Sequence, residues 1–298
     1  MYIQMRHQQG PGGLGWFIDR KIGSTKTPTG HEILTERAAS GLIKNSTDLA
    51  ALIDGSRRPD LADLQDHIKL GEEHRHFLRS IKQSSLDAWW SAINHLKSLH
   101  QQMMASSPVD QFKLIGEALH LIQDSFAPAH VEREPRTGDI LHIRVYSPNA
   151  PPGNHLFHVD PRDDIFTTQP TRMLTFNARK AIACSKEYLQ MALRHIQLKP
   201  LWPLFSRTPA RDLNAFISRR LWLLRPELRI GSRGDWVSEF AGRYNGSSLI
   251  LDLNLPPLPS HGIFDSDMLT AVLAFQNATG LTEKGIVGRQ TWQKLLLP

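Results

Sequence analysis

The spacing of apolar side chains along the chain predicts mostly α-helices. Apolar residues recur at helical spacing in four stretches, residues 29–43, 80–105, 114–124 and 170–200. A short run, Ile140–Tyr146, instead has the character of a strand and precedes a loop rich in proline and glycine. The pattern therefore favours a mainly α-helical fold.

The helix that ends near residue 124 carries the most informative chemistry. In the stretch Gly116–His130, GEALHLIQDSFAPAH, His120 and Asp124 are four residues apart and share one helix face. Pro128 cannot continue the helix, so the chain turns there and returns His130 towards that face. Imidazole and carboxylate groups that converge in this way favour a divalent metal. An isolated His and Asp at this spacing are more often a surface pair, but His130 and the histidine-rich flanks favour the metal.

Composition narrows the kind of metal site and of partner. The 298 residues include fourteen histidines but a single cysteine, Cys184, which excludes an internal disulfide and a thiolate zinc site. Zinc would have to be held by His, Asp and Glu, which suits a catalytic site. The net charge of +6 and the pI near 9.5 favour an anionic partner, such as a phospholipid surface, nucleic acid or a cell-wall polymer.

The sequence offers no membrane or secretory segment. It contains no apolar run of about 18 residues, so we expect no transmembrane helix. Residues 1–15 are polar, rich in Gly and Pro, and expected to be mobile, and they lack the apolar centre of a secretory signal peptide. If the protein acts in the periplasm or cell envelope, we therefore expect export by a non-classical route.

The segment HLIQDSFAPAH resembles the central motif of the zinc-dependent phospholipase C family and of the related single-strand-specific zinc nucleases. In both, a His, an Asp and a second His at the spacing of His120, Asp124 and His130 supply ligands to a cluster of three zinc ions. The resemblance covers residues 16–200. It implies a helical domain with the zinc cluster at the base of a cleft.

The resemblance further implies a set of eight zinc ligands shared among up to three ions. They are His31, Asp60, His76, His120, Asp124, His130, His155 and Asp160. Asp60, His76, His120 and Asp124 would bind one ion, and Asp124 would bridge to a second ion with His31. The third ion would take the last three residues of the set. Asp60 is also the candidate to accept a proton from the attacking water.

Several of these assignments have rivals in the sequence. The pair His155 and Asp160 is one residue longer than the family spacing, which keeps His158 nearly equal to His155. The other rivals are His74 for His76, Asp63 and Asp66 for Asp60, His142 for His155, and Asp163 and Asp164 for Asp160. In the family an N-terminal tryptophan also binds zinc. Trp16 lies at a similar distance before His31 but is not a terminus, so its role is doubtful.

The remaining histidines and tryptophans of the first domain have no expected site role. His95 and His100 are expected at the surface, and His195 suits the C-terminal end of its helix. Trp89 and Trp90 are expected in the core.

The chain changes character after residue 226. The segments at 231–237, 262–265, 271–276 and 285–292 (GSRGDWV, GIFD, AVLAFQ and GIVGRQTW) resemble a peptidoglycan-binding domain of the three-helix type. Asp265 is expected to cap a helix, Gly285 to permit a tight turn and Trp292 to pack the last helix. The resemblance assigns no peptidoglycan-binding residue.

The predicted organisation is therefore a flexible N-terminus (1–15), a zinc phospholipase C-like catalytic domain (16–200), a connector (201–226) and a peptidoglycan-binding domain (227–298). The connector contains a basic amphipathic helix, Ala210–Leu224, which we expect to be solvated. The domains together predict a zinc-dependent phosphodiesterase, first of all a phospholipase C that is anchored to peptidoglycan, and an antibacterial effector is one hypothesis. The alternatives are a zinc nuclease or nucleotidase, and a wall-binding protein that is non-catalytic or acts on peptidoglycan.

Overall fold

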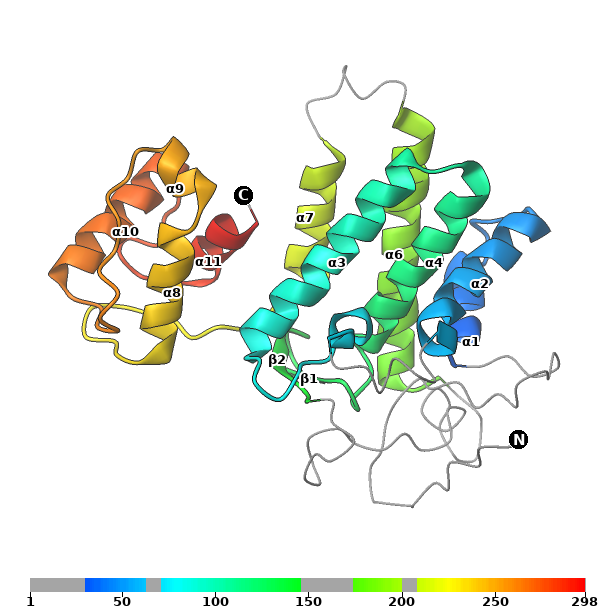
Figure 1. Ribbon diagram of the computed structural model, residues 1–298, viewed down its shortest axis with the longest axis horizontal. Helices are drawn as coiled ribbons and strands as arrows, with labels where there is room; N and C mark the ends of the chain where they lie inside the picture. The colour runs from blue at the N-terminus through cyan, green and yellow to red at the C-terminus, as the bar shows by residue number, and fades with distance from the viewer. Residues whose placement is uncertain (1–29, 63–70, 146–173, 200–207, 298) are drawn as a thin grey trace, which may run out of the picture. The chain divides into compact units, whose positions relative to one another are not determined.

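The structure, a computed structural model, describes residues 30–62, 71–145, 174–199 and 208–297. The chain divides into two compact units, Met1–Leu223 and Leu224–Pro298. Both are mainly helical, which confirms the predicted fold class (Figure 1). Across the described ranges, every helix is too short or too polar to serve as a bilayer span.

The first unit is built around α4, which runs from Pro108 to Asp124. Pro108 occupies the first turn, where its missing N–H costs nothing. Helices α1, α2, α3 and α6 all pack on α4. The described helices of this unit are α1 (Gly30–Ala39), α2 (Ser46–Ala62), η1 (Glu73–His76), α3 (Ser85–Ala105), α4 (Pro108–Asp124), α6 (Phe176–Leu198) and α7 (Pro209–Arg220).

Helices α2 and α4 approach each other so closely that only glycine fits at the contact. A Cβ atom on Gly55 would lie 2.0 Å from the carbonyl oxygen of Lys113, and one on Gly116 would lie 2.2 Å from that of Leu52. The sequence suggested a turn at Gly55 and Pro59, and that expectation was wrong, because both residues lie inside α2. Gly55 serves the helix contact instead, and the close approach brings the end of α2 beside the end of α4.

A two-stranded antiparallel sheet follows α4. Strand β1 (Val131–Arg133) pairs with β2 (Ile140–Ile143), with a bulge next to Arg133. The buried Arg133 donates from Nε to the carbonyl oxygen of Ser125 at 2.7 Å and lies over the Phe126 ring at 4.0 Å. A cation at this place neutralises the partial negative charge of the α4 C-terminus and fixes the turn that leads to His130.

Helix α7 is packed rather than solvated. Leu213, Phe216 and Ile217 are buried, and Arg219 and Arg220 both pair with Glu187 of α6, at 2.8 and 2.6 Å. The expected basic amphipathic helix is present, but its apolar face belongs to the core of the first unit. The contacts divide the chain after Leu223, a few residues before the expected start of the second domain.

Two histidines with no expected role are buried between three helices. His100 of α3 lies 2.9 Å (Nε2 to Nδ1) from His195 of α6, and His195 Nε2 lies 3.3 Å from Asp212 of α7. The Tyr188 hydroxyl is 3.2 Å from His100 Nδ1. The expectation that His100 lies at the surface was wrong, because this hydrogen-bonded chain satisfies its ring nitrogens inside the core.

The second unit contains α8 (Asp235–Asn245), α9 (Ser248–Asp252), α10 (Ser266–Thr279) and α11 (Arg289–Leu296). Asp265 caps α10 as predicted, because its Oδ1 accepts from the backbone N–H groups of Asp267 and Met268. Gly285 has φ +83°, and its N–H donates to Gln276 at 2.6 Å, which holds the predicted tight turn. Trp292 is buried in the core of the unit.

Candidate metal centre

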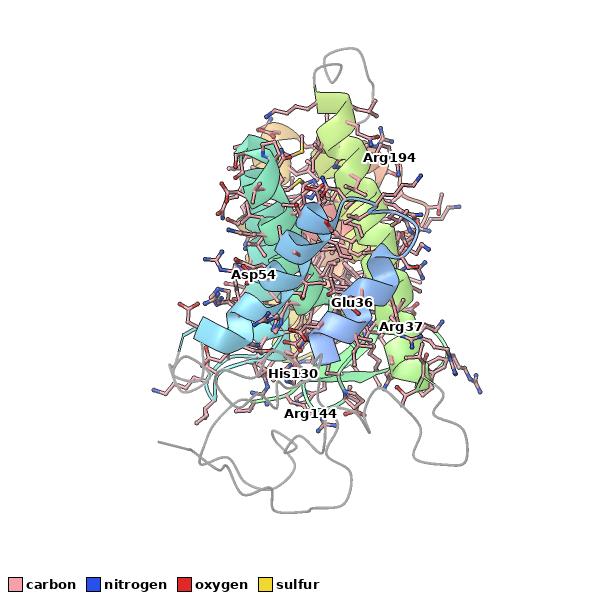
Figure 2. All side chains as sticks on the ribbon, turned by 90° about the vertical axis from the view of Figure 1, so that its right-hand side faces the viewer. Glu36, Arg37, Asp54, His130, Arg144 and Arg194 are labelled. Atoms are coloured by element: carbon pink, nitrogen blue, oxygen red, sulfur yellow. The ribbon has the colours of Figure 1, made fainter. Side chains whose placement is uncertain are left out.

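Five buried side chains from four elements converge at one end of the helices of the first unit. His31 lies in the first turn of α1, Asp60 in the last turn of α2, His76 at the end of η1, and His120 and Asp124 at the end of α4. Figure 2 shows His130, which follows α4, at this end of the helices, while Arg194 lies towards the other.

Four donor atoms in this cluster have the mutual distances of a tetrahedral metal cage. The imidazole nitrogens His120 Nε2 and His76 Nδ1 are 3.1 Å apart. Asp124 Oδ2 lies 3.0 Å from the first and 3.3 Å from the second, and Asp60 Oδ1 lies 3.6 and 3.7 Å from them. Ligand atoms bonded at about 2.0–2.1 Å to a tetrahedral ion lie about 3.3–3.4 Å apart.

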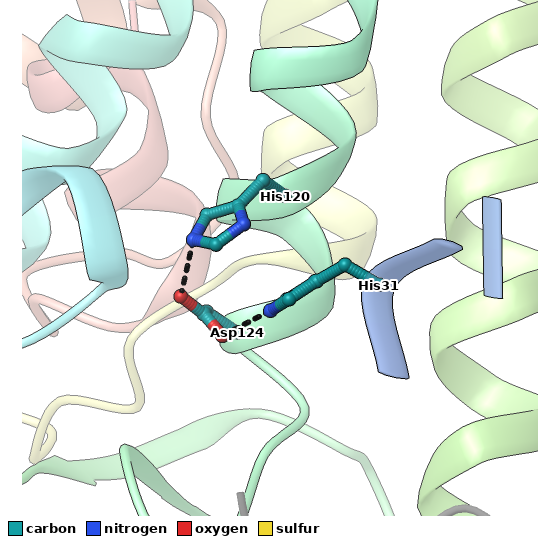
Figure 3. A group of neighbouring side chains, drawn as sticks. All are labelled: His31, His120 and Asp124. Atoms are coloured by element: carbon teal, nitrogen blue, oxygen red, sulfur yellow. Dashed lines mark ion pairs between the residues drawn. The ribbon is translucent and has the colours of Figure 1, made fainter. Parts of the chain in front are cut away.

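The second oxygens of the two carboxylates face a further imidazole. His31 Nε2 lies 3.3 Å from Asp124 Oδ1 and 3.8 Å from Asp60 Oδ2. Figure 3 shows Asp124 between His31 and His120, with one oxygen turned to each ring. Two overlapping triads, His31 with His120 and Asp124, and Asp60 with His76 and His120, therefore have the composition and spacing to hold metal ions.

Outer hydrogen bonds fix the orientation of three imidazoles. His31 Nδ1 donates to the side-chain oxygen of Gln123 at 2.7 Å, His120 Nδ1 donates to the Ser56 carbonyl oxygen at 3.0 Å, and His130 Nδ1 donates to the His76 carbonyl oxygen at 2.7 Å. In the neutral ring this leaves the lone pair on Nε2. Protein metal sites use such outer bonds to set the tautomer of a ligating histidine.

The chain turns sharply at His76. Phe77, which follows it, is wholly buried and has φ 53° and ψ 40°, a left-handed conformation that costs a bulky residue about 1–2 kcal/mol. Packing of the Phe77 side chain offsets this strain and aims His76 at Asp60 and Asp124. Gln123, Ser56 and Phe77 carry no sequence signal for this role, because each acts through a neighbour that is distant along the chain.

Charge in the cluster is strongly coupled. Burial would raise the pKa of Asp124, but His130, His120 and His31 outweigh burial and hold that pKa well below its ordinary value. Burial would lower the pKa of His31, but Asp124 and Asp60 outweigh it, and the pKa is raised. Burial dominates at His130 and lowers its pKa. Asp124 is therefore a permanent anion between the rings.

The donor set fits a bound cation. Neutral imidazoles held by outer hydrogen bonds direct their lone pairs at the carboxylates, an arrangement that is unfavourable unless a positive charge lies among them. Asp60 Oδ2 is buried and makes no hydrogen bond within the described part of the chain. A divalent ion with nitrogen and oxygen ligands satisfies both features.

The rivals that the structure describes lie apart from the cage. His74 Nδ1 is 3.1 Å from the Gly71 carbonyl oxygen, and its ring packs edge-to-face on His95. His142 Nδ1 is 3.1 Å from Ser85 Oγ. His130 approaches the cage, with its Nδ1 3.6 Å from Asp124 Oδ2. The other candidates lie outside the described residues: Trp16, Asp63, Asp66, His155, His158, Asp160, Asp163 and Asp164.

Comparison with known proteins identifies the C-terminal unit. Residues 250–295 match the family described as "Putative peptidoglycan binding domain". Neither the curated proteins nor the solved structures contain a match to the chain. The chain therefore combines a C-terminal peptidoglycan-binding domain with a helical unit that contains buried His/Asp clusters.

Proposed function

We propose that the first unit is a zinc-dependent phosphodiester hydrolase, a phospholipase C that cleaves membrane phospholipids while the second unit holds it to peptidoglycan. The observation that carries this proposal is the cage of Asp60, His76, His120 and Asp124, whose donor atoms lie 3.0–3.7 Å apart in the five distances between them that are given above. Its all-His/Asp composition suits catalysis better than structural support.

In this proposal the cage residues hold one zinc ion, and Asp124 bridges to a second ion held with His31. His130 contributes to a third site with His155 or His158 and Asp160, which lie beyond the described residues. Bound zinc supplies Lewis acidity towards a phosphoryl oxygen and lowers the pKa of water to about 7. Three carboxylate oxygens and imidazole nitrogens per ion leave room for such a water only if the cage opens on one side, as catalytic sites do.

Asp60 is the residue that we assign to proton transfer. Its Oδ2 is buried without a hydrogen bond in the described structure, so it has an acceptor position to spare. Hydrolysis adds the oxygen of water to phosphorus and breaks the bond from phosphorus to the diacylglycerol oxygen. The proton that leaves the water passes to Asp60 and then to the departing alkoxide, so that the products are a phosphorylated headgroup and diacylglycerol.

The wall-binding unit favours lipid over nucleic acid as the substrate. Peptidoglycan lies beside the bacterial membrane, so a protein held there meets phospholipid at high local concentration. The excess of positive charge on the chain, +6, also favours an anionic surface.

The test compares two substrates under the same conditions. The zinc-loaded protein is incubated with phosphatidylcholine/phosphatidylethanolamine vesicles and with single-stranded DNA, each with and without a chelator. The proposal expects chelator-sensitive release of phosphorylated headgroup and intact DNA. Cleavage of DNA with intact lipid would move the activity to a zinc nuclease, and loss of neither substrate would refute a hydrolase.

A matched pair of variants on α4 controls for folding. Asp124→Asn removes the carboxylate shared by both triads, and we expect at least a 100-fold loss of hydrolysis, since even outer partners of metal ligands are worth about 10–100-fold. Asp110→Asn makes the same change at the exposed start of α4 and should leave hydrolysis unchanged.

A further inference from the structure

Helix α8 of the second unit carries a hollow on its exposed face. The five residues that line it are spaced so that they share one side of the helix: Asp235, Ser238, Glu239, Gly242 and Arg243. The hollow encloses about 390 Å³. It exists because Gly242 has no side chain and Ser238 has a short one. A Cβ atom on Gly242 would meet nothing within 4 Å.

The walls of the hollow carry charge of both signs. Arg243 Nε donates to Glu239 Oε1 at 2.7 Å, which holds the guanidinium in place across one turn. Asp235 adds a carboxylate in the first turn. Near this pair, Arg225 lies over the Trp292 ring at 5.2 Å, and burial together with Arg243 lowers the pKa of Arg225 to about 9.

An aromatic ring flanks the charged residues. Trp236 remains 37% exposed, and its ring packs edge-to-face on Trp292 with centroids 6.3 Å apart. On a helix, position 236 lies next to position 243. A ligand in the hollow would therefore meet a flat apolar surface beside the guanidinium of Arg243.

We propose that this face of α8 binds the peptide stem of peptidoglycan. The inference rests on peptidoglycan binding by the second unit and goes beyond it, because α8 precedes the matched residues 250–295. A stem peptide carries free carboxylates and, in many walls, a free amine. Arg243 complements the carboxylates, Asp235 and Glu239 complement the amine, and Trp236 covers the apolar stem atoms.

The neutral glycan strand is the weaker fit. Sugars are held mainly by hydrogen bonds and by stacking on exposed rings, and they gain little from an alternation of two carboxylates and a guanidinium. The charged residues would then be desolvated without a partner, which costs free energy. The charge pattern thus selects the stem as the occupant of this face.

The test fills the hollow without harming the helix. Gly242→Gln in the full chain replaces a poor helix former by a good one at an open position, so the melting temperature of the second unit should stay the same or rise. Retention on purified wall sacculi should weaken at least about tenfold, because the side chain occupies the hollow. Ala278→Gln on the exposed face of α10 is the matched control and should bind as the wild type does.

Two soluble competitors distinguish the parts of the wall. Isolated stem peptides should displace the wild-type chain from sacculi, and glycan strands stripped of their stems should not. Arg243→Met should lose the competition by stem peptides. The proposal is overturned if Gly242→Gln binds like the wild type, if stripped glycan competes as well as the stems, or if the wild type does not bind sacculi. None of these readouts depends on hydrolysis, so they are separate from the test of the zinc enzyme.

Discussion

At the scale of single residues, the most informative side chain beside the cage is Gln123. Its oxygen accepts from His31 Nδ1 at 2.7 Å, and its nitrogen donates to Thr35 Oγ1 at 3.0 Å, all within the buried core. These bonds hold the His31 ring so that Nε2 faces Asp124. His31 therefore depends on Gln123 for its orientation.

We predict that Gln123→Leu weakens zinc binding at the His31 site by roughly 10–100-fold, because the ring loses the acceptor that fixes its tautomer. A competition titration with a chromogenic chelator measures this affinity. Gln123→Glu keeps the acceptor and should restore most of it, and Gln102→Leu on the exposed side of α3 should have no effect. Wild-type affinity in Gln123→Leu would remove Gln123 from the support of the metal.

His100 supplies a second residue-scale prediction, on stability against pH. Burial and the neighbouring His195 lower the pKa of His100 to about 4, below the ordinary value of 6.5. The unfolded chain therefore takes up the proton first as the pH falls, and the contribution of His100 to stability is present above pH 6.5 and lost between 6.5 and 4.

The comparison of interest is between the wild type and His100→Gln in urea unfolding at pH 7.5 and pH 4.5. The wild type should lose about 1–3 kcal/mol more of its free energy of unfolding over this interval than the variant does. Equal losses in the two proteins would show that His100 does not titrate on unfolding. Effects of pH on the metal site are common to both proteins and cancel.

At the scale of elements, the contact of α2 with α4 places the cage. The two glycines of this contact, Gly55 and Gly116, let the helices approach until the Ser56 carbonyl oxygen accepts from His120. Gly116→Ala would put a Cβ atom 2.2 Å from the Leu52 carbonyl oxygen, which belongs to a rigid helix backbone.

We therefore predict that Gly116→Ala destabilises the first unit by roughly 1–3 kcal/mol, the usual range for overpacking, despite the better helix propensity of alanine. It should also lower zinc affinity, because Asp60 moves away from His120. Thermal unfolding and zinc titration measure the two effects. Gly242→Ala, a helical glycine in open space, should be neutral or stabilising; a similarly neutral Gly116→Ala would contradict the close contact.

The elements also show where prediction from sequence succeeds and where it stops. The pairing of His120 with Asp124 follows from helix geometry over four residues, and the Asp265 cap follows from local backbone chemistry. Gly55 was mistaken for a turn signal, because its close neighbour Lys113 lies on another helix. The link from His100 to His195 was missed for the same reason, since nothing near either residue records a partner 95 positions away.

At the scale of the whole molecule, the metal cluster and the peptidoglycan-binding domain belong to separate units. We predict that a chelator abolishes hydrolysis but leaves retention on wall sacculi within about twofold, since the second unit has its own buried core. Sedimentation with sacculi, with and without the chelator, tests this. Release of the protein by the chelator would mean that the wall is bound through the metal.

The central claim is that Asp60, His76, His120 and Asp124 enclose a zinc ion. The most direct measurement is anomalous scattering at the zinc absorption edge from a crystal of the zinc-loaded protein. The account predicts a peak about 2.0–2.2 Å from the donor atoms of all four residues. A map from zinc-loaded crystals with no peak among these residues, or with zinc only elsewhere on the chain, would contradict it.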